Sequence, residues 1–290
     1  MSDTCGIILA GGNGTRLSPL TRSINKHLLP VYDKPMIYYP LSTLMMAGIR
    51  DIAIITRTKD LDLYHNLLGD GSAYGISLNY IAQDEPNGIP EAYVLAKNFI
   101  RKRNIALILG DNILLGQGLG KNLEFSTELT GAKIFAFPVN NPQDYGVVNV
   151  DPNTGRVLSL VEKPTNSNSN LAVPGLYFTD NQAIAVAESL SKSARGEFEI
   201  SDVLNWYLEK NQLQVSTFRR GIGWMDAGSI QSLYAAGELV EVLQKRQGLR
   251  FACPEEIAWG SGWISDDDLE NQASMYPNTE YGSYLKSLLK

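Results

Sequence analysis

The chain has 290 residues, of which 44% are hydrophobic and 19% charged, and its formal net charge is −6. A pI near 5.1 disfavours a general nucleic-acid binder, because neutralising a phosphate backbone needs a basic face. The two cysteines, Cys5 and Cys253, lie far apart in the sequence and favour a reducing compartment such as the cytoplasm. No apolar stretch approaches the length of a membrane span, so we expect neither a signal peptide nor a membrane partner.

The most informative stretch lies near the start of the chain. Residues 5–10 form a short apolar run, typical of a buried parallel strand, and the glycine-rich residues 11–14 follow it directly. Glycine permits positive φ and lets a ligand approach the backbone. Arg16 and Lys26 come next, and residues 12–34 contain four cations and one acid. The pattern indicates a polyphosphate site; a tight turn with surface cations is the alternative reading.

Two common phosphate-binding motifs are excluded at this turn. A Walker A loop needs a second glycine where Arg16 stands, and a dinucleotide-binding fingerprint needs a third glycine where Leu17 stands. A nicotinamide-dependent dehydrogenase is therefore disfavoured.

The next segments alternate between strands and helices. Gly48 and Gly69 are suited to ending two of the helices. The predicted order is a helix over 35–47, a strand over 51–56, a helix over 60–68 and strands over 77–82 and 105–110. This alternation predicts parallel βαβ units with right-handed crossovers. Ligands in such sheets bind beyond the carboxyl ends of the strands, where residues 11–16 and 83–88 would lie.

Polar side chains with useful chemistry follow several of these strands. Gln83 carries both a donor and an acceptor and could read the edge of a base, although the turn-forming residues after it equally suit a plain polar turn. Asp111 follows a buried strand and could hold Mg²⁺ or simply cap a turn. Asp226 would supply a second carboxylate.

The middle of the chain contains candidate groups for a sugar phosphate. Strands are predicted over 132–138, from 144, over 157–161 and over 173–178, with helices over 180–190 and 201–210. Glu162 and Lys163 offer an acceptor for hydroxyls and a cation for phosphate, but such a pair before a proline can also be a solvated strand end. Residues 165–170 are rich in Asn and Ser, which indicates an exposed loop.

Several motifs together resemble the sugar-1-phosphate nucleotidylyltransferase family. They are GGNGTRL at residues 11–17, Pro19, Lys26, LLP at 28–30 and YDKPMIYYPL at 32–41. The last of these resembles the glucose-1-phosphate thymidylyltransferase branch of that family. The likeness extends over nearly the whole chain. It implies an α/β, Rossmann-like fold with a mixed, mostly parallel central sheet flanked by helices, and a small helical C-terminal extension.

The resemblance also implies a reaction and its site residues. The expected reaction joins dTTP to glucose 1-phosphate, giving dTDP-glucose and pyrophosphate, with Mg²⁺ as cofactor. The expected catalytic residues are Arg16, Lys26, Asp111, Lys163 and Asp226, with Asp111 and Asp226 holding the metal. The expected nucleotide-binding residues are Leu9, Gly11, Gly12, Gly14, Thr15, Arg16, Gln83, Gly88 and Asp111. The expected sugar-phosphate-binding residues are Tyr145, Gly146, Glu162, Lys163, Val173, Tyr177, Arg195 and Trp224.

The chain departs from the family pattern at a few positions. Pro90-Glu91 stands where bacterial thymidylyltransferases commonly carry Ala-Gln, His27 replaces a frequent Gln, and Met225 and Ala227 flank Asp226. The first departure leaves the choice between thymine and uracil open, so UTP or another hexose 1-phosphate is an alternative. A non-catalytic regulatory subunit is a further alternative, which the retained cations and aspartates disfavour.

The composition changes after residue 229. A long amphipathic helix is predicted over 230–247 and three shorter ones over 253–258, 266–273 and 277–289. We therefore divide the chain into a nucleotidyltransferase core, 1–228, and a helical region, 229–290. The resemblance implies that this region helps to build a homotetramer with a regulatory nucleotide-sugar site, in an enzyme that begins dTDP-deoxysugar synthesis for surface polysaccharide.

Overall fold

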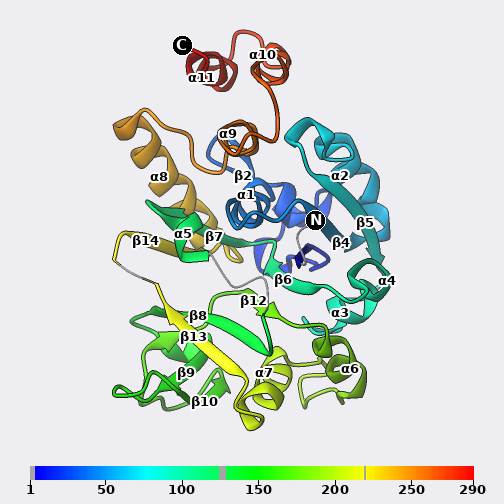
Figure 1. Ribbon diagram of the computed structural model, residues 1–290, viewed down its shortest axis with the longest axis vertical. Coiled ribbons are helices and arrows are strands. Elements are labelled where there is room, and N and C mark those ends of the chain that lie inside the picture. The colour runs from blue at the N-terminus through cyan, green and yellow to red at the C-terminus, as the bar shows by residue number, and fades with distance from the viewer. Residues whose placement is uncertain (1–3, 124–128, 219) are drawn as a thin grey trace.

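The computed structural model describes residues 4–123, 129–218 and 220–290. Figure 1 shows a central sheet flanked by helices, with the last helices stacked at one end of the molecule. The predicted mixed sheet with a helical C-terminal region is confirmed, but the sheet is not mostly parallel, because the strands of its second half pair mainly antiparallel. None of the helices in these three ranges is long and apolar enough to cross a membrane.

The N-terminal half of the sheet is parallel. Its strands, in spatial order, are β5 (Ser77–Gln83), β4 (Asp51–Arg57), β1 (Thr4–Leu9) and β6 (Asn104–Leu109). Ile7 and Ile8 point to opposite faces, as alternation along a strand requires, and each enters a different buried cluster. Burial on both faces explains why β1 and β6 are almost wholly apolar.

The sheet continues through strands that are mainly antiparallel. They are β12 (Leu176–Thr179), β8 (Ala132–Pro138), β11 (Leu171–Ala172), β9 (Gly146–Val150) and β10 (Val157–Glu162), with β13 (Leu213–Thr217) parallel to β8. Because β12 pairs with both β6 and β8, the two halves share one continuous sheet.

Two small strand pairs lie outside this sheet. Strand β7 (Asn112–Gly116) pairs with β14 (Ile222–Asp226), and β2 (Pro30–Val31) pairs with β3 (Lys34–Pro35). The β7–β14 pair brings Asp226 opposite Asn112, the neighbour of Asp111. Segments separated by more than a hundred residues thereby meet at the end of β6.

Helices cover both faces of the sheet. They are α1 (Tyr38–Met46), α2 (Leu61–Leu68), α3 (Glu91–Leu95), α4 (Lys97–Ile100), α5 (Leu119–Leu123), α6 (Gln182–Ser189) and α7 (Ile200–Glu209). Short 3₁₀ turns are η1 (Thr15–Leu17), η2 (Leu20–Arg22), η3 (Lys26–Leu28), η4 (Thr58–Asp60), η5 (Ser72–Tyr74) and η6 (Pro142–Asp144).

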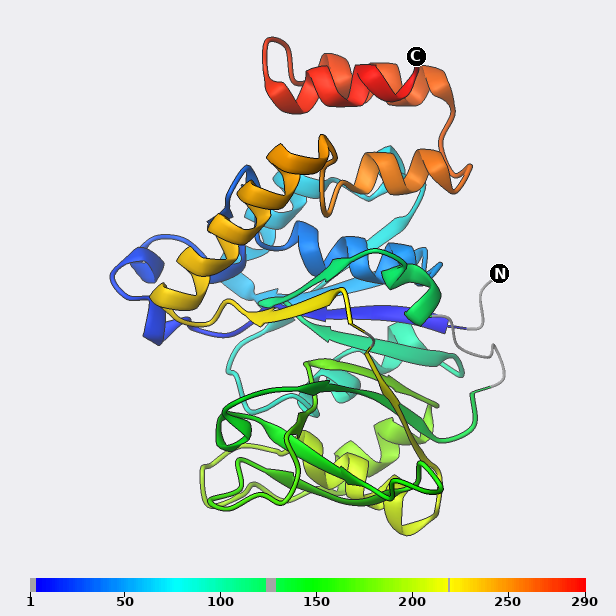
Figure 2. The ribbon, with the colours of Figure 1, turned by 90° about the vertical axis from the view of Figure 1, so that its left-hand side faces the viewer.

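The C-terminal helices gather toward one end of the molecule, as Figure 2 shows from the side. They are α8 (Ile230–Gln247), α9 (Pro254–Gly260), α10 (Asp266–Ser274) and α11 (Glu280–Leu288). A capping box between Ser229 and Ser232 starts α8, and Gly248 ends it at φ 69°. Helix α9 packs on α1, and α10 and α11 pack on each other around Leu269 and Leu285.

Two predicted boundaries are wrong for identifiable reasons. Pro35 does not begin a helix, because it pairs with Pro30 in the β2–β3 hairpin and α1 begins only at Tyr38. The strand predicted over 173–178 is confined to β12, since Val173 bonds to Gly146 and the chain then turns before Leu176.

Candidate active site

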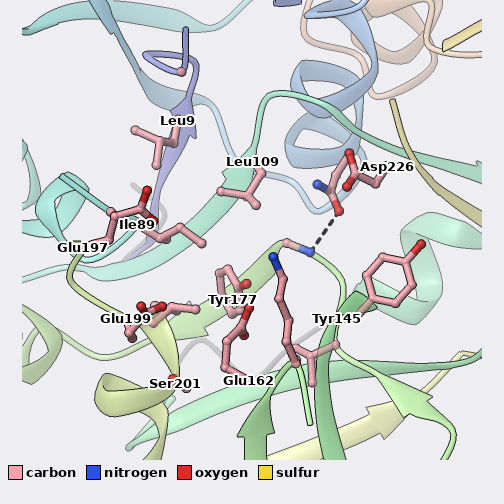
Figure 3. A pocket seen from close by; sticks show the side chains of 18 of the residues that line it. Leu9, Ile89, Leu109, Tyr145, Glu162, Tyr177, Glu197, Glu199, Ser201 and Asp226 are labelled. Atoms are coloured by element: carbon pink, nitrogen blue, oxygen red, sulfur yellow. Dashed lines mark hydrogen bonds between the residues drawn. The ribbon is translucent and has the colours of Figure 1, made fainter. Parts of the chain in front are cut away.

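A cleft of about 440 Å³ lies between the two halves of the sheet. Figure 3 shows Leu9, Leu109 and Ile89 along one side, with Glu162 and Tyr145 facing them from the other half. Leu9 and Leu109 are the last residues of parallel strands. The cleft therefore occupies the sheet edge where ligands of parallel α/β sheets bind.

The glycine-rich loop after β1 is shaped by close contacts. A Cβ on Gly11 would lie 1.9 Å from Gln83 Oε1, and a Cβ on Gly12 would lie 3.5 Å from Lys26 Nζ. Gly14 adopts φ 63°, which glycine takes without steric cost. A side chain at Gly11 would therefore collide with Gln83, whereas one at Gly12 would make an ordinary contact with Lys26.

Two aspartates lie near each other, because Asp111 follows β6 and Asp226 ends β14 opposite Asn112. Asp111 Oδ2 accepts a hydrogen bond from Lys26 Nζ at 2.6 Å, and the carboxylate is largely buried. Burial alone would raise the pKa of Asp111, but Lys26 and His27 hold this pKa at about 2. Burial raises the pKa of Asp226, and the nearby charge of Asp111 raises this pKa further.

This pair of carboxylates fits a hard divalent cation. The Ala227 N–H, next to Asp226, donates to Asp111 O at 3.0 Å, and burial and the charge of Asp111 both raise the pKa of Asp226. A cation between the two carboxylates would relieve their repulsion. Across residues 4–123, 129–218 and 220–290, no group of three or more His, Cys, Asp or Glu side chains could hold a metal. Mg²⁺ is commonly bound by one or two protein carboxylates, with substrate phosphates as further ligands.

Across the cleft, β10 ends in Glu162 and Lys163. Lys163 has φ 45°, an uncommon conformation for a residue with a side chain, and its N–H donates to Tyr145 O at 3.0 Å. Burial raises the pKa of Glu162, while Lys163 and Arg195 oppose this rise. Gly146 approaches so closely that a Cβ there would lie 3.0 Å from Glu162 Oε2.

Arg195 lies in the cleft and pairs with a carboxylate that the sequence analysis did not name. Its Nε and Nη2 donate to Glu199 at 3.0 and 2.6 Å, and Ser193 Oγ donates to the same carboxylate at 2.7 Å. The bidentate hydrogen bond holds the guanidinium in one orientation. The spacing of four residues between Arg195 and Glu199 is the signal in the sequence that could have revealed this pair.

Asn112 is a second residue that the sequence analysis missed as a functional group. Its Oδ1 accepts from Trp224 Nε1 at 2.7 Å and from Gly175 N at 2.9 Å, and its Nδ2 donates to Asp111 at 3.2 Å. Trp224 also packs on Tyr145, with ring centroids 4.9 Å apart. Asn112 thus holds three groups in place: the candidate metal ligand Asp111, the Trp224 side chain that lines the cleft, and the backbone at Gly175.

Most of the predicted site residues line the cleft. These residues are Leu9, Gly12, Arg16, Lys26, Gln83, Gly88, Tyr145, Gly146, Glu162, Lys163, Val173, Tyr177, Arg195, Trp224 and Asp226. Four others, Gly11, Gly14, Thr15 and Asp111, adjoin lining residues in the loop after β1 or at the end of β6. The structure therefore brings together the nucleotide and sugar-phosphate candidates that the sequence spreads over more than two hundred residues.

The fold agrees with the comparisons to known proteins. Residues 5–242 match the nucleotidyl transferase family, so the chain belongs to that family. A protein of known structure that is 24% identical, a UDP-glucose pyrophosphorylase solved with UDP-glucose, shares the fold with a TM-score of 0.72 over 85% of this chain and all of its own.

More similar proteins are glucose-1-phosphate thymidylyltransferases. The enzyme of Mycobacterium tuberculosis is 51% identical, with 98% of this chain and 99% of that protein covered. The enzyme of Xanthomonas campestris is 46% identical over 100% of this chain and 98% of its own. A Bacillus anthracis protein assigned to the same activity, solved with sucrose, is 36% identical with a TM-score of 0.76 and covers 87% of this chain and 98% of its own.

Proposed function

We propose that the protein transfers dTMP from dTTP to glucose 1-phosphate, giving dTDP-glucose and pyrophosphate. The observation that carries the proposal is one cleft lined by cations from both halves of the sheet, Arg16 and Lys26 on one side and Lys163 and Arg195 on the other. Both substrates are anions, so a cleft with positive charge on two sides can hold them close together. Full-length similarity to thymidylyltransferases supports this substrate pair.

In this mechanism an oxygen of the glucose phosphate attacks the α-phosphorus of dTTP. The bond to the bridging oxygen of the β-phosphate breaks, and pyrophosphate leaves with the electron pair. Lys163, held by its backbone bond to Tyr145, orients the attacking phosphate, with Arg195 beside it. Arg16 and Lys26 neutralise the charge that develops on pyrophosphate. The nucleophile is already ionised, so the reaction needs no general base.

Mg²⁺ is the proposed cofactor, held by Asp111 and Asp226. When bound, it would neutralise phosphate charge and make the α-phosphorus easier to attack. Lys26 already bonds to Asp111 at 2.6 Å and keeps that carboxylate ionised and ready to bind a cation.

The nucleotide base is proposed to lie between Leu9, Gln83 and Gly88. Gly88 adopts φ 116° and forms a bridge with Phe198, which brings the nucleotide loop against the segment carrying Arg195 and Glu199. The glucose ring is proposed to contact Glu162, whose carboxylate can accept hydrogen bonds from sugar hydroxyls.

Product analysis tests this function and the choice of nucleotide. The protein is incubated with glucose 1-phosphate, Mg²⁺ and equal concentrations of dTTP and UTP, and the nucleotide sugars formed are separated by anion-exchange chromatography. We expect dTDP-glucose to dominate. If UDP-glucose is the main product, UTP rather than dTTP is the nucleotide substrate. If no nucleotide sugar forms with glucose 1-phosphate or with other hexose 1-phosphates, a non-catalytic regulatory subunit is favoured.

We further propose a cytoplasmic homotetramer that begins dTDP-deoxysugar synthesis for surface polysaccharide and responds to a nucleotide sugar. Support for assembly comes from exposed apolar side chains on the C-terminal helices, among them Tyr234, Val242 and Met275, each more than half exposed. Light scattering should give four times the chain mass of 31.9 kDa. A mass equal to one chain would contradict the assembly without affecting the proposed reaction.

A further inference from the structure

We propose that Gly228 is a positioning residue for the transfer reaction: because it lacks a side chain, the Arg16 guanidinium can lie beside the Asp226 carboxylate. The inference deepens the proposed function and rests on it. Gly228 lies in the turn between Asp226, which ends β14, and Ile230, which begins α8. This turn leads from the cleft to the first of the C-terminal helices.

Two groups of the proposed reaction fill the space next to Gly228. A Cβ on Gly228 would lie 2.6 Å from Arg16 Nη2 and 2.7 Å from Asp226 Oδ1. Both separations are well below the roughly 3.5 Å at which non-bonded atoms pack. The Gly228 N–H also donates to Asp226 Oδ1 at 2.8 Å, which holds this oxygen against the turn. The guanidinium and the carboxylate therefore converge on a point that only glycine leaves open.

The backbone at this position does not itself require glycine. The φ angle of Gly228 lies outside the left-handed region, so an alanine could adopt it without strain. The two atoms that the new methyl group would meet belong to side chains rather than to the backbone. Gly228→Ala should therefore fold normally, provided that one of these two side chains moves.

Arg16 is the side chain that is free to move. Asp226 is half-buried and hydrogen-bonded to the turn, whereas Arg16 is exposed. A neighbouring cavity of about 310 Å³, which Arg16 also lines, gives the guanidinium space to move into. We therefore expect Gly228→Ala to displace the Arg16 guanidinium from the Asp226 carboxylate at little cost in stability.

Displacement of Arg16 should slow the chemical step. In the proposed reaction, Arg16 neutralises the charge that grows on pyrophosphate as its bond to the α-phosphorus breaks. An interaction that strengthens in the transition state contributes more to kcat than to the binding of the substrate. Gly228→Ala should therefore lower kcat, with a smaller change in KM for dTTP.

The test measures pyrophosphate release from dTTP and glucose 1-phosphate with Mg²⁺, together with thermal unfolding. The proteins are the wild type, Gly228→Ala, Arg16→Ala and the variant with both substitutions. Gly223→Ala is the matched control, because Gly223 lies on β14 and a Cβ there would make an ordinary contact, 3.9 Å from Leu115 O. The double variant shows whether Gly228 acts through Arg16, since an effect transmitted by the guanidinium disappears once the guanidinium is removed.

We expect Gly228→Ala to lower kcat by roughly tenfold or more and to change KM for dTTP by less than about threefold. Its unfolding temperature should stay within about 2 °C of that of the wild type. Gly223→Ala should keep the kcat and the unfolding temperature of the wild type. In the Arg16→Ala protein, Gly228→Ala should lower kcat by less than about twofold.

Three results would overturn the inference. Gly228→Ala could keep the kcat of the wild type, which would show that the space is not needed. Its loss of kcat could come with a clearly lower unfolding temperature, which would assign the effect to folding. The loss could also be as large in the Arg16→Ala protein, which would assign it to Asp226. A wild type that releases no pyrophosphate would instead refute the proposed function.

Discussion

At the scale of single residues, the organisation of the cleft depends on buried polar atoms with several partners. Asn112 shows this most clearly. It is 3% exposed and joins Trp224, Gly175 and Asp111, which come from three different parts of the chain. An asparagine can both accept and donate, which neither aspartate nor leucine could do at this position.

Asn112→Ala should lower the free energy of unfolding by about 2–4 kcal/mol, because the Trp224 indole N–H and the Gly175 N–H lose their acceptor. Urea denaturation followed by tryptophan fluorescence measures the change. Asn122→Ala is the matched control, because Asn122 makes a single exposed bond to Gly118 O; its effect should stay within about 0.5 kcal/mol. Equal effects of the two substitutions would contradict the role of Asn112.

At the scale of elements, the two sides of the cleft meet in a backbone contact between Gly88 and Phe198. A Cβ on Gly88 would lie 2.1 Å from Phe198 O, and φ at Gly88 is 116°. Gly88→Ala should therefore either cost about 2–4 kcal/mol of stability or detach the two loops and lower kcat/KM for dTTP at least tenfold.

Gly260→Ala is the control for Gly88→Ala, because no atom lies within 4 Å of the added Cβ at the end of α9. It should leave stability equal or slightly higher, since alanine restricts the unfolded chain. Thermal unfolding measures the stability of both variants, and steady-state kinetics measures their kcat/KM for dTTP. A Gly88→Ala protein with the stability and kinetics of the wild type would show that the contact is dispensable.

A buried carboxylate joins two of the C-terminal helices, α9 and α11. Glu255 Oε2 accepts from Tyr281 Oη at 2.6 Å, while Oε1 has no hydrogen-bond partner. Burial raises the pKa of Glu255 above its ordinary 4.5; Tyr281, Cys253 and Lys34 oppose this rise only in part. The folded state thus keeps a proton that the unfolded state releases, so stability is lost as pH rises from 4.5 through the folded-state pKa.

Glu255→Gln should remove this pH dependence, because glutamine does not titrate. Between pH 4.5 and the folded-state pKa of Glu255, the free energy of unfolding of the wild type should fall by up to about 1.4 kcal/mol per pH unit relative to that of the variant. At higher pH the difference between the two proteins should become constant. Denaturant titrations between pH 4 and 8 measure it. A constant difference across this range would mean that Glu255 has the same pKa in both states.

The sequence predicted elements well where local pattern decides them. The apolar runs of β1, β4 and β6 and the amphipathic α8 are found close to where their patterns indicate. Short strands such as β7, β13 and β14 were not predicted, because their pairing depends on partners about a hundred residues away. The start of α1 was misplaced for the same reason, since the β2–β3 hairpin uses Pro35.

The site residues likewise divide into those that the sequence can predict and those that depend on long-range contacts. Arg16, Lys26, Asp111 and Lys163 could be selected because their types and motifs match a chemistry. Asn112 could not be selected in this way, because folding brings its partners Trp224 and Gly175 to it. Glu199 could have been found from its spacing of four residues to Arg195.

At the scale of the whole molecule, one continuous sheet positions two anion-binding regions across a single cleft. The parallel half supplies Arg16, Lys26 and Asp111, and the antiparallel half supplies Lys163. Strand β12 joins the halves by pairing with β6 and β8, so the distance between the regions is set by backbone hydrogen bonds. This geometry is suited to bringing two phosphates into line.

The most direct test of nucleotidyl transfer is pyrophosphate release from dTTP and glucose 1-phosphate with Mg²⁺, by the wild type and Asp111→Asn. Asparagine keeps the shape of the side chain but removes the charge that pairs with Lys26 and would hold the cation. We predict rapid release by the wild type and at least a hundredfold slower release by the variant. No release by the wild type, or equal release by both proteins, would contradict the account.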